Sequence, residues 1–348
     1  MKPDSLPAAV QRAVSLRAFN TFGLEAVAEY FVEVRGEAEL QALLRQPAIQ
    51  ALPKYVLGGG SNVLLVGNIE GLVIRNLIKG MEVMAEDASR VWLAAGGGEA
   101  WHALVMQAID HGWGGLENLS LIPGSVGAAP IQNIGAYGVE VQDVVSSVRA
   151  MHLQTGELRS FGHPECRFGY RDSVFKRDLK GQFMITGVTF ALQKAPHRLQ
   201  LDYGAIRDEL AAAGILAPTI RDVSAAVIAI RRSKLPDPAI LGNAGSFFKN
   251  PEVAMARFEA LQAQHPGLPG YKVDGETMKI PAGWLIEQAG WKGMRWGNHG
   301  VHAHQALVLV NYGGAEGRDI LSLSTAIMED IQARFGIVLE REVNVIGG

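Results

Sequence analysis

The 348-residue sequence predicts an α+β fold. Three observations indicate it: short apolar runs ending at turn residues fill the first third, three strand-like segments follow at the spacing of a meander, and the last third mixes helices with strands. Disordered and collagen-like classes are excluded, because 48% of the residues are hydrophobic and the 41 glycines show no period of three. Glycine still makes up about 12% of the chain, against roughly 7% in average proteins, and it gathers between apolar runs.

In the first third, apolar runs bounded by turn residues are expected to form strands at residues 30–34, 55–57, 63–66, 72–75 and 91–95. The 55–57 run ends at the sequence GGGSN, residues 58–62, and the 91–95 run ends at three glycines, residues 96–98. We call these two segments the GGGSN loop and the triple-glycine turn. Helical spacing of apolar residues predicts helices at residues 37–45 and 100–111.

The same patterns of apolar and turn residues predict the elements of the middle and last thirds of the chain. Strands are expected at residues 144–153, 157–161, 184–192, 306–311 and 337–346. Helices are expected at residues 205–213, 222–231, 251–264, 282–289 and 319–335, and proline and glycine residues between 236 and 245 mark a long connection. Breaks near residues 80 and 230 predict three domains: 1–80, joined by the C-terminal strand, 81–230, and 231–348.

Charge and cysteine content restrict the partners and the compartment. The net charge of −3 gives no general attraction to nucleic acid or to anionic lipid. Cys166 is the only cysteine, so no intramolecular disulfide can form, as suits a reducing compartment. No apolar run approaches the roughly 20 residues of a membrane span, and the first residues lack the apolar core of a signal peptide. We expect a cytoplasmic monomer that binds neither nucleic acid nor membrane.

Standard nucleotide-binding motifs are absent. The GGGSN loop is followed by Val63 and a further strand, whereas the dinucleotide fingerprint G-x-G-x-x-G needs glycine at that position and then a helix. No P-loop sequence occurs either. Successive backbone N–H groups without side chains, joined by Ser61 and Asn62, would suit a pyrophosphate, although a flexible hairpin turn explains the same residues.

A second cluster of small residues runs through residues 122–138, with the sequence IPGSVGAAPIQNIGAYG. We call it the small-residue loop. Because the loop has few large side chains, its backbone amides could approach a large flat ligand. The alternative interpretation is a tightly packed turn at a helix start.

Together the two loops resemble the FAD-binding domain of the vanillyl-alcohol-oxidase-like flavoproteins, and later motifs narrow the resemblance to the UDP-N-acetylenolpyruvoylglucosamine reductase family. The similarity covers nearly the whole chain, from NTFG at residues 20–23 to LERE at 339–342. Its most specific motifs are IPGSVG at 122–127, YRDS at 170–173, GNAGSFFKNP at 242–251 and AGWLI at 282–286. The 75 positions between Arg171 and Ser246, with Tyr203 between them, are typical of the family's longer branch, which carries a tyrosine loop.

The resemblance implies a two-part FAD-binding domain, a C-terminal α+β substrate-binding domain, and a role in peptidoglycan precursor synthesis and thus in cell shape and division. Members reduce the enol ether of UDP-N-acetylglucosamine enolpyruvate to UDP-N-acetylmuramate, with hydride passing from NADPH to flavin N5 and then to C3. Non-covalent FAD is expected, because Cys166 lies outside both loops. The partners implied are NADPH and the UDP sugar.

The resemblance also assigns residues. The catalytic set is Arg171 on the substrate carboxylate, Ser246 as proton donor to C2, and Glu342. Glu340 is expected to share a strand face with Glu342, or to be displaced if the strand has ended before it. The cofactor-binding residues implied are Gly58, Gly59, Gly60, Ser61, Asn62, Ile122, Pro123, Gly124, Ser125, Gly127, Ala128, Gly135, Ala136 and Arg231. The substrate-binding residues implied are Tyr203, Lys234, Asn250 and Gln305.

Two other functions fit the same fold. One is a flavin-dependent alcohol oxidase or dehydrogenase, against which Lys234 and the GSFFKN sequence argue, since an alcohol needs no diphosphate clamp. The other is an inactive nucleotide-binding protein, against which the complete catalytic set argues. His302 and His304 form an H-x-H pair without further ligands at metal-site spacing, so no metal is expected. The triple-glycine turn is left as a structural turn.

Overall fold

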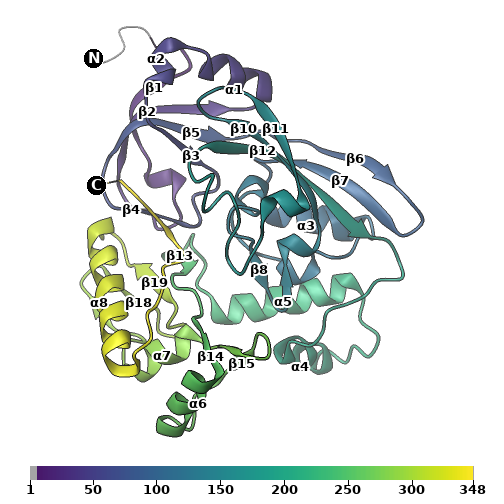
Figure 1. Cartoon of the computed structure of the whole chain (residues 1–348), viewed down its shortest axis with the longest axis vertical. Helices are drawn as coiled ribbons and strands as arrows, with labels where there is room; N and C mark the ends of the chain where they lie inside the picture. Colours follow the sequence, from purple (N-terminus) through teal and green to yellow (C-terminus); the bar gives the residue numbers. More distant parts are fainter. Residues whose placement is uncertain (1–5, 348) are drawn as a thin grey trace. The chain divides into compact units, whose positions relative to one another are not determined.

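The computed structural model describes residues 6–347 in two compact units (Figure 1). Unit 1 comprises the residues up to 14 together with 28–60 and 69–233, and unit 2 comprises 15–27, 61–68 and the residues from 234 onward. The chain therefore passes from one unit to the other inside the GGGSN loop, between Gly60 and Ser61. Residues 1–5 of the first predicted domain, which include the start examined for a signal peptide, and residue 348 of the last lie outside the described part.

The first sheet of unit 1 has the strand order β1-β2-β5-β3. Its bounds are β1 Gln11–Ser15, β2 Val27–Val34, β3 Lys54–Leu57 and β5 Ile69–Asn76, and the helices α1 Glu37–Leu44 and α2 Pro47–Gln50 connect β2 to β3. β5 pairs in parallel with both β2 and β3. Parallel strands need such a helical crossover, and the apolar face of α1 closes their core, where Leu40, Leu72 and Ile74 are fully buried.

The second sheet of unit 1 is antiparallel, with the order β11-β10-β12-β7-β6. Its strands are β6 Met81–Glu86, β7 Arg90–Gly96, β10 Val145–His152, β11 Leu158–Gly162 and β12 Phe183–Gln193. Helix α3, Trp101–Asp110, packs its apolar stripe on this sheet, and the Trp101 ring meets Phe190 edge to face at 5.9 Å between centroids. This packing fixes the N-terminal end of α3, and that end in turn holds the small-residue loop.

Short elements and two further helices complete unit 1. The short elements are η2 Glu117–Leu119, η3 Val126–Ala128, β8 Gly135–Ala136, β9 Val139–Glu140, η4 Val141–Asp143 and η5 His163–Cys166. The helices are α4 Gly204–Ala212 and α5 Ile220–Lys234, whose last residue already belongs to unit 2. Ile206 and Leu210 of α4 pack against Val227 of α5.

Unit 2 is built around a sheet of order β13-β19-β18-β17. Its strands are β13 Gly242–Ser246, β17 Arg295–Trp296, β18 His299–Val301 and β19 Val308–Asn311; a smaller sheet holds β14 Glu252–Ala254, β15 Tyr271–Lys272 and β16 Thr277–Lys279. The remaining elements are η1 Arg17–Phe19, β4 Val63–Leu65, α6 Met255–Gln264, α7 Ala282–Gln288, α8 Gly317–Phe335 and β20 Asn344–Ile346. β20 pairs in parallel with β4, so the chain's last strand joins residues from its first fifth.

Most expected elements are confirmed, and two are wrong in part. The helix predicted at 251–264 begins only at Met255, because residues 252–254 pair with β16 as a strand. Of the strand predicted at 337–346, only Asn344–Ile346 forms a regular ladder; the segment before it is extended and bridges Phe248 through Arg341. Strand β6 was not expected, because five of its six residues are exposed and it lacks an apolar run. The three-domain division stays a prediction.

The triple-glycine turn packs backbone on backbone. A Cβ on Gly96 would lie 2.4 Å from the carbonyl oxygen of Ile78, and one on Gly97 would lie 2.3 Å from that of Ile185. The Gly97 N–H donates to Thr186 O at 2.7 Å, and the Gly98 N–H donates to Ile78 O at 2.7 Å. Only glycine allows this approach, so the turn ties β7 to β12 and to the end of the first sheet.

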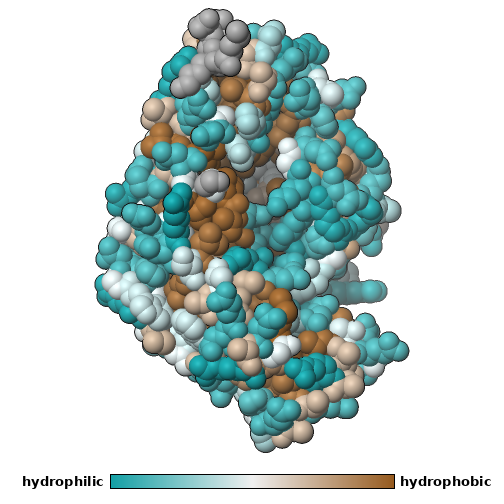
Figure 2. All heavy atoms as spheres, turned by 60° about the vertical axis from the view of Figure 1, so that its left-hand side comes forward, coloured by the Kyte–Doolittle hydropathy of each residue, from teal (hydrophilic) through white to brown (hydrophobic). Residues whose placement is uncertain are grey.

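Among residues 6–347, no helix combines the length and hydropathy needed to cross a membrane. The face seen in Figure 2 is mainly hydrophilic, with hydrophobic side chains in smaller groups. Exposed apolar side chains include Leu216 and Ile240, which lie in turns.

Gly97→Ala should lower the free energy of unfolding by about 1–3 kcal/mol, because the added methyl group would meet backbone atoms that cannot rotate away. Denaturant titration followed by circular dichroism measures the change. Gly267→Ala is the matched control: its Cβ would have open space, and its stability should stay within about 0.5 kcal/mol of wild type. Equal stability of the two variants would contradict the packing described.

Candidate active site

The GGGSN loop and the small-residue loop meet through their main chains within unit 1. A Cβ on Gly58 would lie 2.4 Å from Ser125 Oγ, and a Cβ on Gly59 would lie 2.9 Å from Gly124 Cα. Gly60 adopts the left-handed conformation with φ of 62°. The contact leaves no room for side chains between the two loops, so the predicted cofactor residues at 58–60 and 124–125 are brought together.

The small-residue loop is held by the segment that runs from the triple-glycine turn into α3. The Gly127 N–H donates to Gly97 O at 2.8 Å, and the Val126 N–H donates to Glu99 O at 2.9 Å. A Cβ on Gly127 would lie 2.9 Å from Ile185 O. The triple-glycine turn is therefore more than a structural turn, because it supports the loop that carries Ile122, Pro123 and Ala128.

Arg231 of α5 has a buried donor without an acceptor. Its Nε has no hydrogen-bond partner among the described residues, although the guanidinium also interacts with the Tyr137 hydroxyl. Burial raises the pKa of Tyr137, so this hydroxyl stays protonated at neutral pH. A buried N–H without a partner costs free energy.

FAD fits this set of groups. An oxygen of FAD would satisfy the Arg231 donor, and the absence of side chains at residues 58–60 would let a pyrophosphate approach the backbone there. Ser61 and Asn62 lie across the boundary in unit 2, where Asn62 Nδ2 donates to Glu342 O at 3.3 Å.

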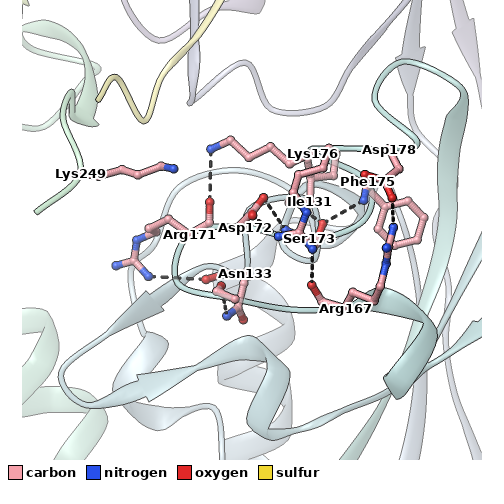
Figure 3. Close-up of polar contacts among 12 residues, drawn as sticks. Ile131, Asn133, Arg167, Arg171, Asp172, Ser173, Phe175, Lys176, Asp178 and Lys249 are labelled. Atoms are coloured by element: carbon pink, nitrogen blue, oxygen red, sulfur yellow. Dashed lines mark hydrogen bonds and ion pairs between the residues drawn. The ribbon is translucent and has the colours of Figure 1, made fainter. Parts of the chain in front are cut away.

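Arg171 stands on a strained turn next to the small-residue loop (Figure 3). Its φ of 52° is rare for a residue with a side chain and indicates a conformation held by its surroundings. Its guanidinium donates to Gly135 O at 2.5 Å and lies 3.8 Å from the Glu140 carboxylate. Asp172, the neighbour that could have neutralised it, pairs with Arg177 instead.

Asn133 fixes the same turn and was not predicted. It is fully buried, and its Nδ2 donates to Gly169 O at 2.9 Å and to Glu140 at 2.7 Å. Ser173 Oγ donates to Ile131 O at 2.6 Å from the other side of Arg171 (Figure 3). The structure thus joins Arg171 to Gly135, a predicted cofactor residue, through the turn that Asn133 holds.

Tyr203 precedes helix α4 and is 44% exposed. Its ring meets that of Tyr137 edge to face, with 5.1 Å between centroids. Tyr203 therefore lies near the Arg231 and Tyr137 group in unit 1.

In unit 2, a β-bulge presents Ser246 at the end of β13. Asn243 pairs with Val310 and Ser246 with Val308, so two residues of β13 face one of β19. Gly245, in the bulge, has a φ of 71° and open space around its Cβ position. Glycine is needed there for its backbone conformation, since a side chain would be strained at this φ even with room to spare.

Asn243 holds this bulge and was not predicted. It is 2% exposed, its Oδ1 accepts from the Gly245 N–H at 2.9 Å, and its Nδ2 donates to Leu241 O at 2.8 Å and Pro236 O at 3.2 Å. The buried Asn243 amide therefore links the long segment that follows Lys234 to the turn that carries Ser246.

Glu342 lies beside Ser246. The Glu342 N–H donates to Phe247 O at 2.8 Å, and the Lys249 N–H donates to Glu340 O at 2.9 Å, so residues 340–342 run antiparallel to 247–249. The Glu340 carboxylate is 70% exposed and pairs with Lys249 Nζ at 2.9 Å. The Glu340 carboxylate is therefore engaged in a surface ion pair.

The predicted substrate residues of unit 2 differ in their surroundings. Lys234 is exposed at the end of α5. Asn250 Oδ1 accepts the Ala282 N–H at 3.0 Å at the start of α7, which leaves its amide nitrogen as the donor side. Gln305 Oε1 accepts the Leu307 N–H at 3.3 Å in the turn before β19. Among the contacts of the described residues, none joins Lys234, Asn250 and Gln305 into one cluster.

His302, His304 and Cys166 take no part in these groups. His302 and His304 meet edge to face with 5.7 Å between ring centroids, and the buried His302 Nδ1 has no hydrogen-bond partner within residues 6–347. No group of three or more possible metal ligands occurs among the described residues. Cys166 is fully buried, and its burial, with the Glu165 charge, raises the pKa of the thiol to about 12.

Comparison with known proteins assigns the family. Residues 28–162 match the FAD binding domain family, and residues 237–346 match the family of the UDP-N-acetylenolpyruvoylglucosamine reductase C-terminal domain. The chain is 50% identical over 337 residues to the UDP-N-acetylenolpyruvoylglucosamine reductase of Flavobacterium johnsoniae, covering 97% of this chain and 99% of the relative. The chain belongs to the UDP-N-acetylenolpyruvoylglucosamine reductase family. The predicted resemblance is confirmed.

Two further members of this reductase family agree. The enzyme of Pseudomonas fluorescens is 51% identical over 335 residues, with 96% of this chain and 98% of the relative covered. The crystal structure of the reductase from Thermus caldophilus is 27% identical, with a TM-score of 0.67, and covers 97% of this chain and 99% of its own. The predicted fold class, an FAD-binding domain followed by the reductase family's C-terminal domain, is therefore confirmed.

Cys166 should be inert toward alkylating reagents in the native protein. Because a pKa near 12 leaves almost no thiolate at pH 8, labelling by iodoacetamide should be at least about 100-fold slower than in guanidinium chloride. Mass spectrometry of timed samples measures both rates. Rapid native labelling would show that Cys166 is neither buried nor protonated.

Proposed function

We propose that this chain reduces the enol ether of UDP-N-acetylglucosamine enolpyruvate to UDP-N-acetylmuramate, with NADPH as reductant and FAD as cofactor. The observation that carries the proposal is the 50% identity to a curated reductase of that name along 97% of the chain. The presence of Arg171, Ser246 and Glu342 at the positions of the family's motifs supports it. The reaction belongs to peptidoglycan precursor synthesis, hence to cell wall formation, cell shape and division.

The cofactor would be held without a covalent bond by the two loops. The backbone at residues 58–60 and 124–125 suits the pyrophosphate, whereas the N–H groups of residues 126–128 already donate within the protein. Ser61 and Asn62 add polar groups, and Arg231 offers its unpaired Nε–H to an oxygen of FAD. Bound FAD supplies the hydride carrier between NADPH and C3 of the enolpyruvyl group. The inert Cys166 supports non-covalent binding, since no activated thiolate is present there to bond the flavin.

Arg171 is proposed to stabilise the charge that develops on the substrate. Hydride addition at C3 leaves an enolate that spreads over C2 and the carboxylate. A guanidinium stays positive at all physiological pH values and binds a carboxylate through two donors. Because the strained turn and the bond to Gly135 already fix Arg171, little reorganisation would be needed when the charge appears.

Ser246 is proposed to deliver the proton to C2. A serine hydroxyl is a weak acid in water, but an enolate is a strong base, so a positioned hydroxyl suffices. The Gly245 bulge and the Asn243 amide set that position. Glu342, whose backbone is bonded next to Ser246, is proposed to complete the polar surroundings of the reacting carbon.

The diphosphate of the substrate needs cationic and amide donors. Lys234 supplies an exposed ammonium group, and Asn250 supplies its amide nitrogen, because its oxygen caps α7. Tyr203 is proposed to cover the nucleotide as part of the tyrosine loop, and Gln305 to contact the sugar. We further propose residues 1–80 and 81–230 as the FAD-binding subdomains, residues 231–348 as the substrate-binding domain, and a cytoplasmic monomer as the working form.

Ser246→Ala separates the two half-reactions. We expect NADPH to reduce the bound flavin at nearly the wild-type rate, whereas reoxidation by the enolpyruvyl substrate should slow by about 10²–10⁴-fold, because the proton donor is lost. Stopped-flow absorbance of the flavin follows each step. Ser89→Ala, at an exposed turn in unit 1, is the control and should leave both steps unchanged. Equal slowing of both steps would refute the role of Ser246, and wild-type protein that cannot be loaded with FAD would refute the proposed function.

Lys234→Ala should weaken binding of the UDP sugar by about tenfold or more, as expected for a lost charge-assisted hydrogen bond. The rate of flavin reduction by NADPH should be unchanged. Titration calorimetry with UDP-N-acetylmuramate, the product, measures the affinity. Lys292→Ala is the matched control, since Lys292 pairs with Glu287 on the surface at 2.8 Å. An unchanged affinity in the Lys234 variant would exclude it as a diphosphate contact.

A further inference from the structure

The first turn of α3 holds, through hydrogen bonds, the segment that leads into the small-residue loop. Trp101 Nε1 donates to Leu119 O at 2.9 Å, and the Trp101 N–H donates to Gly124 O at 3.0 Å. Between these two bonds, the Leu121 N–H donates to His102 Nδ1 at 3.0 Å. His102 is the only titratable side chain of the three contacts.

The hydrogen bond to His102 matters at Leu121 because the Leu121 backbone is strained. Its φ of 60° lies in the left-handed region, which costs free energy for a residue with a branched side chain. The strained residue directly precedes Ile122, where the predicted cofactor residues of the loop begin. A change at His102 therefore acts on the conformation of the loop at its entry.

The bond requires the neutral imidazole. Nδ1 can accept the Leu121 N–H only while it carries no proton, whereas both ring nitrogens of an imidazolium are donors. His102 is half-buried and faces Arg231 and Arg232 of α5. The nearest carboxylate on η2, that of Glu117, is engaged by the Gly115 N–H at 2.6 Å. No carboxylate among these contacts favours the imidazolium.

We propose that His102 is a positioning residue for FAD: its neutral ring holds Leu121 and thereby the small-residue loop, and its protonation releases the loop and weakens FAD binding. The inference rests on the proposed function, because that function places FAD on this loop. It makes no use of the catalytic residues.

The direction of the pH effect follows from the surroundings. Burial first, and then the charges of Arg232 and Arg231, lower the pKa of His102. A lowered pKa in the folded protein means that its contribution is complete above the unfolded value of about 6.5 and is lost as the pH falls through the lower, folded value. FAD retention should therefore weaken on the acid side of neutrality.

The test measures FAD affinity between pH 7.5 and 5 by the fluorescence of released FAD, in wild type, His102→Asn and His102→Phe. Wild type should lose about fivefold or more in affinity across this range, as for one lost hydrogen bond. Asn keeps an acceptor near the Nδ1 position without titrating, so His102→Asn should change less than twofold. His102→Phe should bind weakly at every pH. The matched control His111→Asn, at the other end of α3, should follow wild type, because the Nδ1 of His111 faces the Gln107 carbonyl and donates.

A second measurement does not depend on FAD. Hydrogen exchange of the Leu121 amide in the apoprotein, corrected for the intrinsic rate at each pH, should lose protection at low pH in wild type and keep it in His102→Asn. The proposal is overturned if His102→Asn shows the wild-type pH dependence in either measurement, or if His102→Phe binds FAD as tightly as wild type at pH 7.5. Failure of FAD binding in every variant, with the exchange result as expected, would overturn the proposed function alone.

Discussion

The main-chain contact between three glycine segments is the constraint on which unit 1 depends. Gly59 lies on Gly124, Gly127 lies on the triple-glycine turn, and that turn lies on the backbone of Ile185. At each contact a single methyl group would force apart main chains that also carry the hydrogen bonds between the segments. The glycines at these contacts are thus accounted for by packing, because their missing side chains allow the loops that are proposed to hold FAD to stack.

Unit 2 brings together two residues that are far apart in the sequence. Ser246 ends a strand, and Glu342 lies in an extended segment that pairs with the residues directly after Ser246. The buried Asn243 fixes the bulge that precedes Ser246 through three hydrogen bonds of its side-chain amide rather than through apolar contacts. Such fully bonded polar groups specify one conformation where an apolar core would tolerate several.

The sequence predicted the long helices and the central strands well, since their apolar periodicity is local. It failed where pairing is not local: residues 252–254 form a strand only because Thr277–Lys279 lies beside them. Among the site residues, the motif at Ser246 was visible, but the left-handed turns at Arg171 and Leu121 were not, because neither residue type favours that conformation. Asn133 and Asn243 were missed because a buried asparagine looks like a loop residue until its partners are known.

The pairing of β20 with β4 bears on how the chain matures as it is synthesised. β4 leaves the ribosome long before its partner strand β20, and Leu64 and Leu65 of β4 are buried in the folded protein. Throughout that interval an apolar strand edge waits unpaired, which is the state most prone to association with other chains. The two larger sheets of unit 1 are complete by residue 193, so the long wait for a partner strand falls on unit 2.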